Sequence, residues 1–148
     1  MKILLPATIV VVALAVLAGC ATQARLTSFR QSEIALQEAR QQASVDCSTE
    51  PQCSRVWMLA RNYVEARSAT RIRRADDSII ETAAPHTFGV AYFWAEKEAA
   101  GGVSTIHLRG MCRGMYSSDG GPGWMYASCA EQIREAEMQF RSFIDEAH

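Results

Sequence analysis

An unbroken run of ten apolar residues, Ile9 to Ala18, limits which part of this 148-residue chain can belong to a folded domain. Lys2 is the only charged residue before the run ends. A positive start followed by about 7 to 15 apolar residues is typical of a secretory signal peptide. A membrane-spanning helix needs about 20 apolar residues. We therefore expect residues 1–19 to be a signal peptide, with an uncleaved membrane anchor as the alternative.

The apolar run ends in Leu17-Ala18-Gly19-Cys20. This tetrapeptide resembles the lipobox of bacterial lipoproteins at all four positions. The resemblance implies that signal peptidase II cleaves before Cys20 and that Cys20 is lipidated, with palmitate among the acyl chains; two or more chains hold a protein stably to a membrane. In that family an Asp after the cysteine favours the inner membrane. Ala21 stands there instead, which implies an outer-membrane anchor and a domain facing the periplasm.

Four cysteines remain after Cys20, and an even number in an exported domain indicates disulfides. They allow three pairings. We favour Cys47–Cys53 with Cys112–Cys129, because each cysteine then bonds its nearest neighbour in sequence. The second bond would stabilise the fold by about 3 kcal/mol in the chain-entropy model. No Cys-x-x-Cys pair is present and the histidines lack ligand spacing, so we expect no metal and no cofactor.

The segment of residues 20–46 contains no Gly or Pro and is rich in helix formers. We expect it to be a partly helical tether, with a partner-binding helix as the alternative. A single domain is expected over residues 47–148. It begins with a helix from Glu50 to Arg67, where apolar residues recur at helical spacing.

Strand patterns fill the middle of this domain. The segment from Phe88 to Lys97 has apolar residues on both faces, which predicts a central strand covered on both sides. The last helix is expected to start at the capping box of Ser128 and Glu131 and to carry an ion pair between Glu137 and Arg141. The four expected strands are Thr70 to Arg74, Ile79 to Thr82, Phe88 to Lys97 and Val103 to Cys112. The order helix, four strands, helix predicts an α+β fold with a four-stranded antiparallel sheet, helices on one face, and two disulfides.

A second resemblance concerns the part of the chain after Cys20. The residues that carry it are Cys47, Cys53, Trp57, Ala60, Tyr63 and Val64, then Asp77 to Thr82, then the cysteine pair Cys112 and Cys129. These positions are similar to a group of small, functionally uncharacterised proteobacterial envelope lipoproteins. The loop between the last two cysteines is longer here than that pattern expects. The resemblance implies an envelope location and a fold, but no chemistry.

Motifs of catalysis are missing from the sequence: it contains no HExxH, GxSxG, P-loop or GxGxxG. We therefore name no catalytic residue and expect a protein that is not an enzyme. The formal net charge of −1 argues against a nucleic-acid binder that works by overall charge.

Two groups of residues are candidate binding surfaces. The first is the loop of Tyr116, Trp124 and Tyr126, because aromatic residues are enriched at protein interfaces and a disulfide would preorganise the loop. The alternative is that these side chains fold back as a small core under the loop. The second group is cationic and would bind an anionic partner, with a solvated polar sheet face as the alternative. It consists of Arg71, Arg73, His107 and Arg109.

The function predicted from the sequence is a non-enzymatic lipoprotein of the outer membrane. Its domain would bind an envelope protein or polymer. The alternative is a small inhibitor or ligand-binding lipoprotein, such as one that acts on a lysozyme-like hydrolase. Loss of muramidase activity on mixing would favour the inhibitor, and capture of a partner after crosslinking would favour the binding module.

Overall fold

The computed structural model describes the backbone of residues 4–147 and the side chains of residues 22–147. The predicted signal peptide, residues 1–19, and Cys20 therefore lie outside the residues whose side chains are described. The chain divides into two compact units, one ending at Ile34 and the other starting at Ala35. Helix α1 extends over Leu4–Gln42, and the second unit contains all the other elements.

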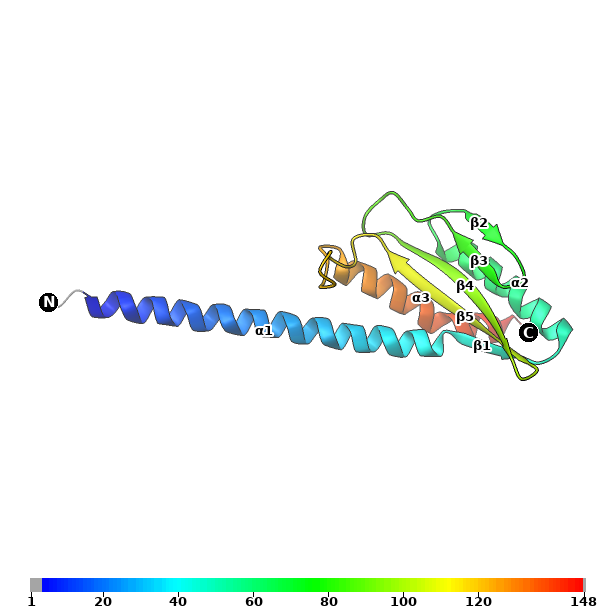
Figure 1. Ribbon diagram of the computed structural model, residues 1–148, viewed down its shortest axis with the longest axis horizontal. Helices are drawn as coiled ribbons and strands as arrows, with labels where there is room; N and C mark the ends of the chain where they lie inside the picture. Colours follow the sequence, from blue (N-terminus) through cyan, green and yellow to red (C-terminus); the bar gives the residue numbers. More distant parts are fainter. Residues whose placement is uncertain (1–3, 148) are drawn as a thin grey trace. The chain divides into compact units, whose positions relative to one another are not determined.

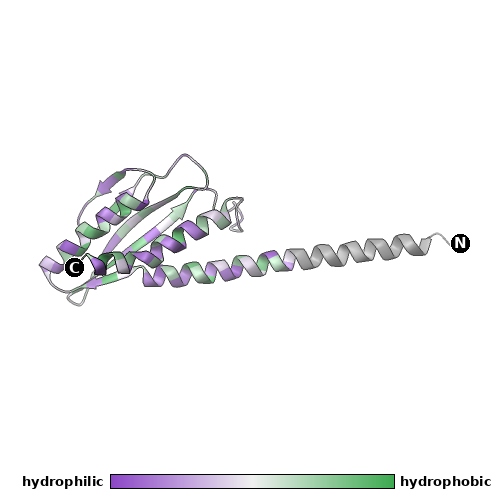
Figure 2. Ribbon diagram, turned by 180° about the vertical axis from the view of Figure 1, so that it is seen from behind, coloured by the Kyte–Doolittle hydropathy of each residue, from purple (hydrophilic) through white to green (hydrophobic). Residues whose placement is uncertain are grey.

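The second unit is an α+β fold built on one antiparallel sheet (Figure 1). The sheet order is β1-β5-β4-β3-β2, so consecutive strands are neighbours except at β1. Helices α2 (Glu50–Arg67) and α3 (Tyr126–Glu146) cover the same face of the sheet, as Figure 2 shows from behind. The strands are β1 (Ser44–Cys47), β2 (Ile72–Ala75), β3 (Ile79–Thr82), β4 (Ala91–Ala100) and β5 (Val103–Cys112).

The core lies between this sheet and the two helices. Tyr63 of α2 donates a hydrogen bond of 2.7 Å from its hydroxyl to the carbonyl of Ala136, and its ring meets that of Phe140 edge-on. This contact joins α2 to α3 above the sheet. The other large or central buried residues are Val56, Ala60, Val64, Ile133 and Ile144 of the helices and Ile80, Phe93, Ile106 and Leu108 of the strands.

Both expected disulfides are present, between Cys47 and Cys53 and between Cys112 and Cys129. The first joins the end of β1 to the start of α2. The second joins the end of β5 to the first turn of α3. Together they fix both helices to the strands on which they pack.

The sheet has five strands, so the prediction of four is wrong. The additional strand, β1, pairs with β5 through Val45 opposite Ile106. Its first three residues belong to the segment expected to be a tether, and four residues are too few to produce a readable alternation. Leu36 and Ala39 are also buried. The compact unit therefore starts before Cys47.

The last helix also differs from expectation. It begins at Tyr126 after an N-cap residue, Met125, that makes no side-chain capping bond, so the capping box at Ser128 is wrong. The ion pair of Glu137 with Arg141 is wrong as well. Glu137 lies on the buried stripe of α3, one turn before Phe140, whereas Arg141 donates to the carbonyl of Ser44.

Strand β4 is central, but only one of its faces is covered by α2 and α3. Ala91, Phe93 and Ala95 are buried beneath those helices. Tyr92 and Trp94 are half-buried on the opposite face, because side chains alternate along a strand. We call this opposite side the open face of the sheet. The expectation that β4 is covered on both sides is therefore wrong.

Candidate functional site

A stack of three side chains stands at the end of the sheet where β4 begins and β5 ends. The rings of Phe88 and Trp124 have centroids 5.2 Å apart, and the guanidinium of Arg113 lies 4.5 Å from the centroid of the Phe88 ring. Trp124 is 76% exposed and Phe88 is 43% exposed. We call these three residues the aromatic stack. A large aromatic surface in this position is available to a partner.

Backbone hydrogen bonds hold the loop that presents Trp124. The amide of Gly123 donates to the carbonyl of Met115, and the amide of Met125 donates to the carbonyl of Gly114. Gly123 is required at this crossing, because a Cβ there would lie 2.3 Å from the carbonyl oxygen of Gly114. The loop is therefore tied across its base, and the disulfide fixes its two ends.

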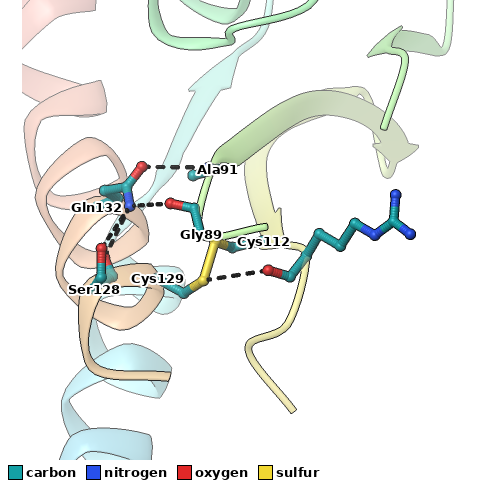
Figure 3. Close-up of a disulfide and its surroundings, with 7 residues drawn as sticks. Gly89, Ala91, Cys112, Ser128, Cys129 and Gln132 are labelled. Atoms are coloured by element: carbon teal, nitrogen blue, oxygen red, sulfur yellow. Dashed lines mark hydrogen bonds between the residues drawn. A yellow bond between two sulfur atoms is a disulfide. The ribbon is translucent and has the colours of Figure 1, made fainter. Parts of the chain in front are cut away.

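The segment that carries Phe88 is tied to the same framework. Gly89 donates from its amide to the carbonyl of Arg113 at 2.9 Å. Gln132 of α3 bridges to this segment: its Nε2 donates to the carbonyl of Gly89 at 2.8 Å and its Oε1 accepts from the amide of Ala91 at 3.3 Å (Figure 3). Gln132 thus holds the Phe88 segment to α3, and the disulfide of Cys112 with Cys129 holds the Trp124 loop to the same helix.

The residues of the predicted binding loop differ in their exposure to solvent. Trp124 points to solvent, whereas Tyr126 is 7% exposed at the start of α3 and Met115 is fully buried. Tyr116 is at the margin, with its ring edge-on to that of Tyr126. Part of the loop therefore forms the small core expected as the alternative, while Tyr116 is 37% exposed and Trp124 is the most exposed aromatic of the loop.

Sequence reasoning missed three residues of this site. Phe88 was assigned to a strand, but it precedes β4 and turns toward Trp124. Arg113 is the first residue of the predicted loop, Arg113 to Ser128, but no role is predicted for it, and Gln132 is not predicted at all. Pro85 and Gly89, which break the strand pattern on either side of Phe88, were the available signal that this residue lies in a loop.

Two adjoining hollows lie on the open face of the sheet, with volumes of about 330 and 370 Å³. Both are lined by Ala84 and Tyr92, so the two hollows meet at these residues and are treated together as one groove. The hollow of about 370 Å³ is also lined by Arg113. Because the Arg113 guanidinium lies over the Phe88 ring, this hollow is next to the aromatic stack. We call the two hollows together the sheet groove. Its other principal lining residues are Arg73, Ile79, Glu81, Trp94 and Glu96 in one hollow and His86 and Met111 in the other.

The structure separates the four residues of the predicted anion-binding face. His107 and Arg109 alternate with buried residues of β5 and so lie on the open face, but only Arg73 of the four lines the described groove. Arg71 precedes β2. The four residues therefore do not converge on a common point.

Carboxylates neutralise two of these cations. Arg73 lies 2.8 Å from Glu81, and Arg109 lies 3.9 Å from Glu96. Glu96 also accepts a hydrogen bond of 2.8 Å from the indole Nε1 of Trp94. The open face therefore carries balanced charges around its aromatic residues.

Neither a metal site nor a membrane span stands out in the described part of the chain. Its residues contain no group of three or more His, Cys, Asp or Glu side chains placed to hold an ion. Within the same residues, no helix is both long and apolar enough to cross a bilayer. No protein-family model, curated protein or solved structure matches this chain.

Proposed function

We propose that this chain is a lipid-anchored protein of the bacterial cell envelope, not an enzyme, whose domain binds an envelope protein through the aromatic stack. The observation that carries this proposal is the exposure of Trp124 on a loop whose backbone is tied on both sides. An apolar ring exposed to water is unfavourable unless a partner covers it. Here the framework holds the ring outward.

The composition of the stack suits a protein partner. Trp and Arg are the residues most enriched among those that dominate binding energy at protein interfaces. Trp124 supplies apolar area, and Arg113, held by its bond to the carbonyl of His86 and by Phe88, supplies a positioned donor. Because the disulfide and Gln132 hold both segments before binding, little ordering free energy is lost when the partner binds.

The anchor is supported by the lipobox and by the disulfides. Cys20 is the lipidated residue in this proposal, and the acyl chains place the domain at the outer membrane, facing the periplasm. Two disulfides suit that oxidising compartment. A Cys20→Ala variant is expected to be unprocessed and to lose the lipid label from radioactive palmitate. Unchanged labelling and processing would overturn the anchor.

The binding proposal is tested by crosslinking the full-length protein in its own envelope and identifying captured proteins. Trp124→Ala is expected to reduce capture of a specific partner at least tenfold, as for a dominant interface residue. Met58→Ala is the matched control, because Met58 is an exposed apolar residue of α2, 56% accessible. Equal capture by a folded Trp124→Ala protein and by the control would remove the aromatic stack from the function.

A further inference from the structure

We propose that the sheet groove is a second binding site, which holds a neutral oligosaccharide strand against Tyr92 and Trp94. This inference does not rest on the aromatic stack or on the lipid anchor. It comes from the juxtaposition of two aromatic rings, paired charges and the two hollows on the open face of the sheet. The ribbon shows that α2 and α3 lie on the other face (Figure 1).

The two rings form a platform. Tyr92 and Trp94 are two residues apart on β4, so both project from the same face, and their centroids are 6.2 Å apart with 34° between the ring planes. The hydrogen bond from Trp94 to Glu96 fixes the indole. A sugar ring has faces of C–H groups, whose positive hydrogens are attracted to the negative face of an aromatic ring. Two neighbouring rings at this angle can contact successive sugar units of a strand.

Polar groups beside the platform match the hydroxyls of a sugar. Glu81 and Glu96 line the groove, and each ionised carboxylate has about four acceptor sites. Arg73 already uses its Nε and Nη2 on a single oxygen of Glu81, which leaves the other oxygen to accept from a ligand hydroxyl. Hydroxyl groups can both donate to these carboxylates and accept from the arginine.

The charges of the groove select against ionic ligands. Two arginines and two glutamates line it, and Arg73 with Glu81 forms a close pair. An anion would be repelled by the carboxylates and a cation by the guanidinium groups, so a neutral polyhydroxylated ligand fits best. The groove also crosses the face of β3, β4 and β5. An extended peptide that added as a strand would need a sheet edge instead.

The test uses the full-length protein in detergent micelles and the soluble tetramer of N-acetylglucosamine as the probe. In a two-dimensional ¹H–¹⁵N NMR spectrum each of the three tryptophans contributes one indole signal, which the Trp94→Ala and Trp57→Phe variants assign. Saturable movement of the Trp94 signal is expected, while that of Trp57, which donates to the carbonyl of Asp76 outside the groove, stays fixed. This measurement needs no substitution, so it decides the proposal even if a variant fails to fold.

A pair of variants then locates the site. Trp94→Ala is expected to weaken tetramer binding at least tenfold in calorimetry, and Trp57→Phe is the matched control with unchanged affinity. Trp124→Ala is expected to keep tetramer binding while losing the captured protein, so failure here and failure of the proposed function give different results. A peptidoglycan stem peptide serves as the competing probe. A fixed Trp94 signal with the tetramer, or movement with the stem peptide alone, would overturn the proposal.

Discussion

The guanidinium of Arg40 lies 3.6 Å from the carboxylate of Glu137, and the Glu137 side chain is fully buried. Neither carboxylate oxygen makes a hydrogen bond of ordinary geometry among the described residues, although Arg40 and the backbone of Gly110 face the carboxylate closely enough to lower its pKa. Burial disfavours the charged form and raises the pKa of Glu137 to about 7, and the positive charge of Arg40 offsets part of this rise. The last turns of α1 are thus linked to the inner face of α3 by a group that titrates near neutral pH.

This relationship predicts a protein that loses stability as the pH rises from 4.5 to about 7. In the unfolded chain Glu137 ionises near its ordinary pKa of 4.5, whereas the folded state keeps the proton until about pH 7. The folded state therefore binds more protons in this window, and its advantage is complete below 4.5 and lost as the pH passes 7. The free energy of unfolding should fall by about 3 kcal/mol, as urea denaturation at several pH values will show.

Glu137→Gln is expected to remove this slope and to make the protein more stable than the parent above pH 7, because the amide is neutral at every pH. Glu135→Gln is the control, since Glu135 is exposed on the same helix. Its profile should follow the parent. A Glu137→Gln protein that keeps the parent's slope would show that another group titrates.

The disulfides are expected to differ in their contribution to stability. Cys112 and Cys129 are 17 positions apart, and Cys47 and Cys53 are 6 apart. In the chain-entropy model the longer loop contributes about 3 kcal/mol and the shorter about 2. Replacing each pair by alanines and comparing urea unfolding free energies will check this order. A larger loss for the shorter loop would show that local contacts outweigh chain entropy.

Sequence patterns predicted the parts of the fold in which local periodicity agrees with burial. Helix α2 and strand β3 match the expected bounds, and β5 does as well, because buried Ile106 and Leu108 alternate with polar residues. The disulfide pairing also followed from sequence distance. By contrast, β1 is a strand only because β5 offers it a partner, and no pattern within four residues could show this.

The candidate site was predicted only in part, because its residues meet across distant segments. Trp124 could be identified because its loop is rich in aromatic residues. Its neighbour Phe88 could not, because the hydrogen bond from Gln132 that holds the Phe88 segment is a tertiary contact. Similarly, the arginines of the expected cationic face could be placed on strands, but the register that sets Glu81 beside Arg73 depends on a bulge in β2.

Gly123 provides a test of the loop framework. A Cβ at Gly123 would lie 2.3 Å from a backbone oxygen of Gly114, which has no freedom to rotate away. Gly123→Ala should therefore cost about 1–3 kcal/mol and displace Trp124. Gly121→Ala is the matched control, because its Cβ would meet the hydroxyl of Ser117 at 3.3 Å, a contact that a small rotation relieves. Thermal unfolding that ranks the two variants equally would contradict this account.

Gln132 is expected to fix the segment that carries Phe88 without itself contacting the partner protein. Gln132→Ala removes the bonds to the carbonyl of Gly89 and the amide of Ala91, at a cost of about 1–2 kcal/mol. Hydrogen exchange at the Ala91 amide should accelerate. Capture of the partner should weaken although Trp124 and Phe88 remain. Glu131→Ala, an exposed change on the same helix, should stay within about 0.5 kcal/mol of the parent. Unchanged exchange at Ala91 in the Gln132→Ala protein would show that β5 and the disulfide alone fix this segment.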